Sequence, residues 1–188
     1  MTPDQAVVAV CAALDAAAMP YMLVGSLAAN FHGIPRSTRD ADFVVELAPG
    51  SLQRLEAHLP HGLMLEHQGA FAAVTGTMRY LVTLAGSPFV CELFVLSDDA
   101  HDQERFARRQ SARVLTHDAF VAAAEDMIVT KLRWAAGAHR SKDRDDIRNI
   151  LAVQGSDLDW AYLDRWSTAH DTASLLAEIR ASVPPHLN

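Results

Sequence analysis

Two aspartates one residue apart could bind a metal ion. Asp40 and Asp42 flank Ala41 and lead into the apolar run FVV. On a strand, alternate residues share a face, so both carboxylates point the same way and the apolar residues face the core. At about 5 Å and an effective dielectric constant near ~20, the two charges repel by roughly 3 kcal/mol. A divalent cation or a raised pKa would relieve this, and hard oxygen ligands suit Mg²⁺ or Mn²⁺. The structural alternative is the solvated start of a strand.

Glu92 is the only charged residue in the strand-like segment FVCELFVL. A buried carboxylate without a partner is costly, so this position calls for an explanation. If the strand runs beside the one that bears Asp40 and Asp42, the three carboxylates form a cluster able to hold two metal ions. If it is an edge strand, Glu92 faces water or meets an arginine.

Gly25-Ser26 lies between a predicted strand and a predicted helix. A glycine and a small hydroxyl residue let backbone amides approach a phosphate there, helped by the helix dipole. An ordinary strand-to-helix turn has the same composition, so the position of the pair matters. Thirteen residues separate Ser26 from Asp40.

The composition is that of an ordinary globular chain. With 188 residues, 50% of them hydrophobic, it can bury the core of one domain. The net charge of -7 argues against a general nucleic-acid coat, although residues 101–148 hold 10 of the 16 Lys and Arg but only 8 of the 23 Asp and Glu, which leaves room for a polyanionic ligand. The sequence contains no run of about 18 apolar residues, the length that would predict a membrane span. Two cysteines in apolar segments indicate a reducing compartment, and we expect the cytoplasm.

The elements that hold these residues mix helices and strands. Helical spacing of Val7, Val10, Leu14 and Ala18 predicts a first helix, with Thr2 as its cap. Strands are expected at 21–24, 39–47, 70–74, 78–84 and 89–96, and helices at 27–32 and within 51–59. From about residue 99 the pattern changes to helices, with an edge strand expected at Val114-Leu115 and helices at 118–136, 141–153, 158–166 and 172–183. We therefore predict an α/β fold, with a mixed-sheet core over residues 1–115 and a helical region over 116–188 packed on it.

The combined pattern resembles the nucleotidyltransferase superfamily that includes DNA polymerase beta. The string GSLAANFHGIPRSTRDADFVV is similar to its minimal and toxin/antitoxin-associated branches, with Gly33 followed by Arg36, Thr38 and Asp40 in an R-x-T-x-D pattern. The later segment EDMIVTKLRWAAGAHRSKDRDDIRNIL resembles the second conserved block of the type IV toxin (AbiEii-like) relatives. Its helix lysine is Lys131, and Lys142-Asp143 and Asp146-Ile147 match the signature that follows.

The resemblance implies a mixed sheet flanked by helices, Mg²⁺- or Mn²⁺-dependent binding of a nucleoside triphosphate such as ATP, and transfer of a nucleoside monophosphate to a hydroxyl. Asp40, Asp42 and Glu92 would bind metal, with Glu92 as a possible base, although a shorter aspartate is common at that position. Lys131 would neutralise phosphate charge, and Asp143 and Asp146 would position this lysine or the acceptor. The residues implied to contact the nucleotide are Gly25, Ser26, Arg36, Thr38, Lys131, Asp143 and Asp146.

The acceptor stays open at this point among RNA, protein and a small molecule, as does a cognate toxin or antitoxin partner. A non-catalytic, antitoxin-like module that binds a nucleotide or a partner protein is the alternative. A hydrolase that uses the same carboxylates lacks a convincing nucleophile motif.

Overall fold

The structure, a computed structural model, describes residues 1–73, 75–138 and 141–184. It divides into two compact units. Unit 1 contains Met1–Leu27 and Thr38–Ala122, and unit 2 contains Ala28–Ser37 and the chain from Ala123 onward. The chain therefore passes from one unit to the other three times. The boundary near residue 115 that the sequence suggests, between a mixed-sheet core and a helical region packed on it, stays a prediction.

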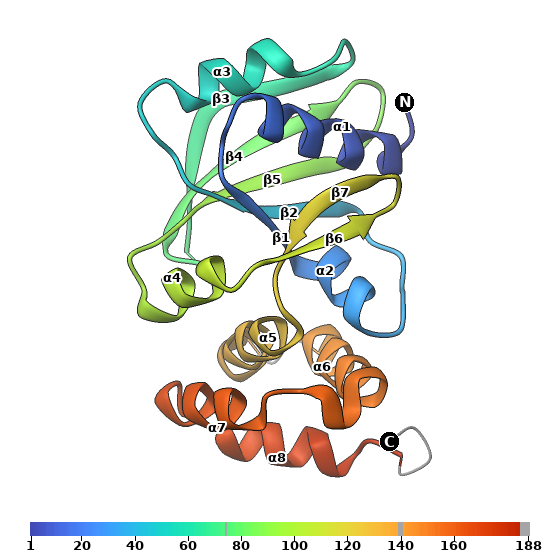
Figure 1. The fold of residues 1–188 in the computed structure, drawn as a ribbon, viewed down its shortest axis with the longest axis vertical. Helices are drawn as coiled ribbons and strands as arrows, with labels where there is room; N and C mark the ends of the chain where they lie inside the picture. Colours follow the sequence, from blue (N-terminus) through green and yellow to red (C-terminus); the bar gives the residue numbers. More distant parts are fainter. Residues whose placement is uncertain (74, 139–140, 185–188) are drawn as a thin grey trace. The chain divides into compact units, whose positions relative to one another are not determined.

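Unit 1 is built on a mixed sheet of seven strands in the order β3-β4-β5-β2-β1-β7-β6 (Figure 1). The two central strands β2 and β5 are parallel, and β1 lies antiparallel to β2 and parallel to β7. This confirms the predicted mixed α/β architecture. The strands are β1 (Tyr21–Val24), β2 (Asp40–Val45), β3 (Leu63–Ala72), β4 (Thr77–Leu84), β5 (Val90–Val95), β6 (Gln110–Val114) and β7 (His117–Val121).

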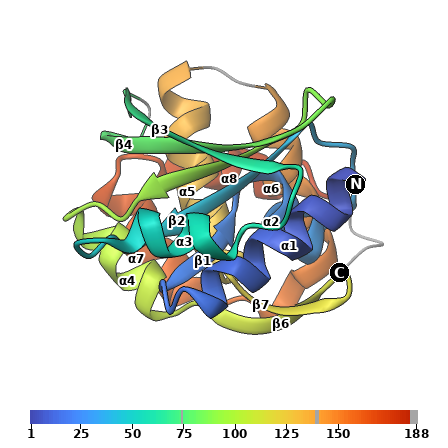
Figure 2. The ribbon, with the colours of Figure 1, turned by 90° about the horizontal axis from the view of Figure 1, so that it is seen from above.

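Two helices, α1 (Pro3–Ala16) and α3 (Ser51–His58), cover one face of this sheet (Figures 1 and 2). Phe43, Cys91 and Leu93 are at most 1% exposed and belong to the core. Because side chains alternate along a strand, the residues between them point to the other face. The fold thus separates an apolar face from a face that carries the acids. Unit 1 also contains α4 (Ala100–Ala107).

The first helix begins as the sequence predicts. Thr2 and Gln5 form a capping box, in which each side chain accepts a hydrogen bond from the backbone N–H of the other, and Pro3 takes the first helical position. The helix ends before Ala18, however, which has a φ of +48°. The prediction that Ala18 continues the apolar stripe of the helix is wrong, because Ala17 caps the helix.

Unit 2 is helical. It contains α5 (Ala124–Ala138), α6 (Ser141–Gln154), the short 3₁₀ helix η1 (Gly155–Asp157), α7 (Trp160–Ala169) and α8 (Ala173–Ala181). The helix α2 (Gly25–His32) carries the chain from unit 1 into unit 2. The helices predicted at 141–153, 158–166 and 172–183 correspond to α6, α7 and α8.

The prediction of one helix over 118–136 is wrong in its first part. Residues His117–Val121 form β7, which pairs with β6 along its whole length, and α5 begins only at Ala124. The segment AFVAAAEDM is apolar enough to fit either period, and here Ala119 and Val121 are buried while Asp118 and Phe120 are exposed. That alternation is the signature of a strand, and the pairing with β6 satisfies its backbone.

The strand expected over 70–74 begins earlier than predicted. It is β3, which starts at Leu63 and contains an irregularity in its pairing with β4 between Glu66 and Ala70. The polar stretch EHQG in its middle is exposed on this edge strand, so it shows no apolar alternation. Val74, where the sequence places the end of the strand, lies outside the described residues. Among the residues that are described, no helix is long and apolar enough to cross a membrane.

Candidate functional site

The three predicted acids lie on the same face of the two central strands. Asp42 of β2 is the direct partner of Glu92 on β5, and Asp40 precedes Asp42 by two residues on β2. Residues opposite each other on neighbouring strands, and residues two apart on one strand, share a face. The strand of Glu92 therefore runs beside the strand of the two aspartates.

Gly25 and Asp42 are in close contact at the end of β1. Asp42 pairs with Val24, the last residue of β1, and the next residue, Gly25, begins α2. A Cβ atom on residue 25 would lie 1.8 Å from Oδ2 of Asp42, and the backbone of Gly25 has a φ of +63°. Both facts require glycine here. The contact brings the Asp42 carboxylate against the N-terminal end of α2, where Ser26 is the second residue.

Thr38 holds Asp40. Its hydroxyl donates a hydrogen bond of 2.8 Å to Oδ1 of Asp40 and lies 3.3 Å from the backbone oxygen of the same residue. The threonine thus fixes one carboxylate oxygen and leaves the other oxygen for a different partner. The structure thus shows a bond from Thr38 to the aspartate, and the nucleotide contact expected of Thr38 stays a prediction.

Glu92 has a cationic partner that the sequence reasoning missed. Nη1 of Arg79, on β4, donates a hydrogen bond of 3.0 Å to Oε1 of Glu92. The strand of Glu92 is not an edge strand, because it lies between β4 and β2, yet its side chain meets an arginine. Arg79 could have been found as the only charged residue of TMRYLVTL, just as Glu92 is the only one of its own strand.

The three carboxylates are not gathered as tightly as a complete metal cage. Within the described parts of the chain, one group of three side chains of the types that bind metals has its ligand atoms within 4.8 Å of one another. It consists of Asp99, His101 and Asp102. That group has a structural explanation, since Oδ1 of Asp99 caps α4 through the N–H groups of His101 and Asp102. Asp102 also forms an ion pair of 2.8 Å with Arg105.

The remaining predicted residues form a second cluster, in unit 2. Nζ of Lys131 on α5 lies 2.7 Å from Oδ2 of Asp146 and 3.2 Å from Oδ1 of Asp143, both on α6. Arg36 binds the same Asp146 with two nitrogens, at 2.7 and 2.8 Å. The side chains of Lys131, Asp143 and Asp146 are at most 3% exposed, whereas that of Arg36 is 33% exposed. Two cations and two anions balance in this buried network.

The charges of this network act on Asp146. Burial raises the pKa of its carboxyl group, but the hydrogen bonds and charges of Arg36 and Lys131 outweigh burial, so the pKa lies below its ordinary value. Asp146 is therefore ionised at neutral pH. Both aspartates contact Lys131, and their predicted role of positioning this lysine or the acceptor stays a prediction.

Asn30 and Gly33 fix the segment that carries Arg36. The side chain of Asn30 accepts a hydrogen bond from the N–H of Arg36 and donates one to its backbone oxygen. A Cβ atom on Gly33 would lie 3.0 Å from the backbone nitrogen of Ile150, so the glycine permits close packing on α6. Unit 2 thus orders the chain between Gly25-Ser26 and Asp40.

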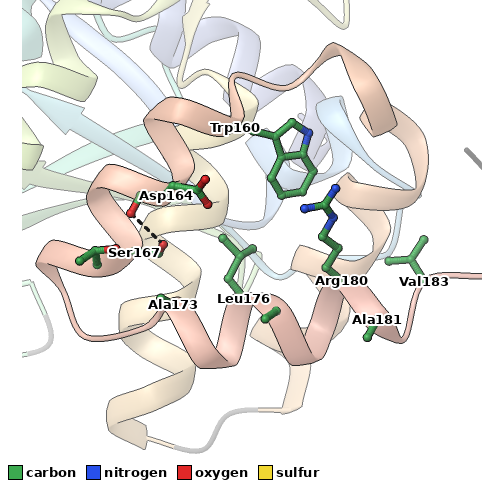
Figure 3. Close-up of a pocket in the computed structure, with 10 residues that line it drawn as sticks. Trp160, Asp164, Ser167, Ala173, Leu176, Arg180, Ala181 and Val183 are labelled. Carbon is green, nitrogen blue, oxygen red and sulfur yellow. Dashed lines mark hydrogen bonds between the residues drawn. The ribbon is translucent and has the colours of Figure 1, made fainter.

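A cavity of about 650 Å³ lies between α7 and α8, and none of the predicted site residues lines it (Figure 3). The guanidinium of Arg180 lies 3.8 Å from the centre of the Trp160 ring at one end of it. Ser167 donates a hydrogen bond of 3.3 Å to the backbone oxygen of Asp164 on its wall. Asp40, Asp42 and Glu92, the acids predicted to bind a metal with a triphosphate, do not line it.

No protein-family model and no curated protein matches the sequence. Solved structures do match its fold. The solution structure of the antibiotic-resistance factor ANT(2'')-Ia superposes with a TM-score of 0.60 at 14% identity, over 95% of this chain and 96% of that one. The crystal structure of ANT(2'')-Ia in complex with adenylyl-2''-tobramycin gives 0.60 at 14% identity, over 90% and 99%.

An antigenic nucleotidyltransferase-like protein from Paracoccidioides brasiliensis gives a TM-score of 0.53 at 16% identity, over 96% of this chain and 95% of that one. At such identities the likeness establishes the fold, and the fold is that of nucleotidyltransferases and nucleotidyltransferase-like proteins. The AbiEii-like branch is not confirmed.

Proposed function

We propose that the chain is a Mg²⁺- or Mn²⁺-dependent nucleotidyltransferase that moves a nucleoside monophosphate from a nucleoside triphosphate to an acceptor hydroxyl. One observation carries the proposal. The Asp42 carboxylate touches Gly25 at the start of α2 and is paired on the sheet with Glu92. A phosphate-binding turn and metal-binding acids are thereby neighbours, although they are distant in the sequence.

The donor set fits a hard divalent cation. Asp40, Asp42 and Glu92 offer carboxylate oxygens only, which suit Mg²⁺ or Mn²⁺ and not the sulfur- or imidazole-rich sites of softer metals. When bound, the metal neutralises triphosphate charge and polarises the phosphoryl group. Thr38 orients Asp40 for this task through its hydrogen bond. The first backbone amides of α2, at Gly25 and Ser26, bind the phosphate oxygens.

In the buried network of unit 2, Arg36 is the residue whose side chain a ligand could reach most easily. Its side chain is 33% exposed, whereas that of Lys131 is 2% exposed and bound to two aspartates. Lys131 and Asp143 then hold Asp146, and Asp146 holds Arg36 by two bonds. The sequence-based assignment, in which Lys131 itself neutralises the phosphate, stays a prediction.

For the acceptor, we propose a small molecule with several hydroxyl groups. The support is the likeness over almost the whole chain to ANT(2'')-Ia, whose crystal structure holds adenylyl-2''-tobramycin. An RNA or protein acceptor, with a cognate toxin or antitoxin partner, is the competing possibility. The same experiment separates them.

A non-catalytic binding module is the second candidate, and a specific observation favours it. Arg79 gives Glu92 an ion-pair partner, so the glutamate has a structural reason to be where it is without any metal. In that case the chain would bind a nucleotide or a partner protein without transferring anything.

The test is a transfer assay with each of the four labelled nucleoside triphosphates, Mg²⁺, and pools of aminoglycosides, cellular RNA and cellular protein. We expect label in the small-molecule pool with the wild type and none with Asp42→Asn. Asp118→Asn, which changes an exposed aspartate of unit 1 that pairs with Arg113, is the matched control and should transfer normally. Label in RNA or protein would replace the acceptor, and nucleotide binding without transfer to any pool would favour the non-catalytic module.

A further inference from the structure

Glu92 lies between a cation and an anion. In the strand order, β5 has β4 on one side and β2 on the other, so Arg79 approaches Glu92 from one neighbour and Asp42 from the opposite one. The bond of 3.0 Å goes to Arg79. The glutamate thus takes its partner from β4, on the side of its strand away from the metal-binding aspartates.

This arrangement explains the spacing of the three acids. Arg79 occupies Oε1 of Glu92. Asp40, Asp42 and Glu92 are not among the described groups of three whose ligand atoms lie within 4.8 Å of each other, the separation that one shared ion requires. The structure therefore shows a site in which the third ligand is held by another residue.

The ion pair between Arg79 and Glu92 is one that can be broken at little cost. The side chain of Arg79 is 34% exposed and that of Glu92 is 20% exposed, so the pair is reached by water and is only weakly stabilising. Nε of Arg79 is buried without a hydrogen-bond partner among the described residues, so the bond to Glu92 leaves the guanidinium partly unsatisfied. A divalent cation, with twice the charge, is the stronger partner for a carboxylate that Asp42 already adjoins.

We propose that Arg79 and the divalent cation compete for Glu92. In the metal-free protein, Glu92 is bound to Arg79, which offsets the charge of the acids. When the metal binds, Glu92 gives up Arg79 and becomes the third carboxylate ligand beside Asp40 and Asp42. Arg79 is thus a positioning residue that sets the metal affinity of the site. This inference rests on the proposed function, since it assumes that the acids bind a metal.

The test measures Mn²⁺ affinity by electron paramagnetic resonance, without nucleotide, in the wild type, Arg79→Gln, Glu92→Gln and the double variant. A partly exposed ion pair lost as a competitor corresponds to about two- to fivefold in affinity. We expect Arg79→Gln to bind Mn²⁺ tighter by that factor, and the same change to have no effect in the Glu92→Gln background. Arg113→Gln, which removes an exposed arginine of β6, should leave the affinity unchanged.

Three results would overturn the inference. Arg79→Gln could bind Mn²⁺ no tighter than the wild type, or the gain could persist in the Glu92→Gln background, which would make it a plain effect of net charge. If Arg79→Gln does not fold, Arg79→Lys replaces it. An unchanged Mn²⁺ affinity in that variant, although its pairing with Glu92 is weakened, would count against the inference. A wild type that binds no Mn²⁺, with or without nucleoside triphosphate, would overturn the proposed function itself.

Discussion

Asp42 packs directly against Gly25, so that a side chain on residue 25 would come within 1.8 Å of its carboxylate oxygen. The glycine is required by its neighbour as much as by its own φ of +63°. Gly25 and Asp42, 17 positions apart in the sequence, are thus tightly packed against each other. A side chain on residue 25 would therefore displace the acid.

Gly25→Ala should therefore damage the site far more than a typical glycine substitution. We expect loss of the thermal stabilisation that Mg²⁺ and ATP give to the wild type, because Asp42 has to move. Gly86→Ala is the matched control, since Gly86 also has a positive φ, +75°, but no atom within 4 Å of an added Cβ. It should cost only the backbone strain, about 1 kcal/mol in unfolding free energy. Equal ligand responses in the two variants would refute this reading.

Thr38→Val should weaken Mg²⁺-dependent nucleotide binding. The hydroxyl of Thr38 donates to Oδ1 of Asp40, and a hydrogen bond to a charged group contributes about 1.5 kcal/mol or more. The expected loss is about tenfold in affinity by isothermal titration calorimetry. Thr38→Ser keeps the hydroxyl and should stay close to the wild type. An equal loss in both variants would indicate that the methyl group, and not the hydrogen bond, matters.

Asp146→Asn should destabilise unit 2. The change leaves Lys131, with a side chain only 2% exposed, bound to Asp143 alone and releases Arg36. Removal of one partner from a buried ion network costs about 3 kcal/mol, measured by urea unfolding. Asp145→Asn, next in sequence but 58% exposed in its pair with Arg148, should cost about 0.5 kcal/mol or less. Similar costs for the two variants would contradict the buried network.

The same aspartate predicts how stability depends on pH. Burial opposes ionisation of Asp146, but Arg36 and Lys131 lower its pKa below the ordinary value. A carboxyl group whose pKa is depressed by folding stabilises the protein above its unfolded-state pKa and loses this contribution as the pH falls through the folded-state pKa. The difference in unfolding free energy between wild type and Asp146→Asn should be constant from about pH 7 to 5 and shrink below about pH 3.9. A difference that shrinks already between pH 7 and 5 would contradict the depressed pKa.

Both cysteines should resist alkylation in the folded protein. Burial raises the pKa of Cys11 and of Cys91 to about 12, so almost no thiolate is present at pH 8. Mass spectrometry after iodoacetamide treatment should show no added mass in native buffer and two adducts in denaturant. Rapid alkylation of the native protein would show that unit 1 opens frequently.

The acids of the site could be predicted because their types conflict with their surroundings. Asp40, Asp42 and Glu92 interrupt apolar strands, and such a cost points to a purpose in a single sequence. The hydrogen bond between Thr38 and Asp40 joins residues two positions apart, but the sequence indicated Thr38 only as a nucleotide contact. The parallel pairing of β2 with β5, in contrast, joins segments about fifty residues apart. The sequence could therefore say only what would follow if the two strands were neighbours.

What the sequence could not reveal depends on contacts across long separations or on ambiguous periods. Arg79 is an ordinary strand arginine until its neighbour on β5 is known. The apolar run around Ala119 fits a strand or a helix, and the pairing of β7 with β6 decides it. The burial of Lys131 between its two aspartate partners on α6 also depends on contacts that only the three-dimensional structure reveals.

Residues 28–37 belong to unit 2, although they lie between two stretches of unit 1. The helical unit is therefore not a continuous piece of the coding sequence. A fragment that starts at Ala123 would lack Arg36 and leave Asp146 and Lys131 without part of their network. A single recombination crossover could therefore not move the helical unit intact onto another core.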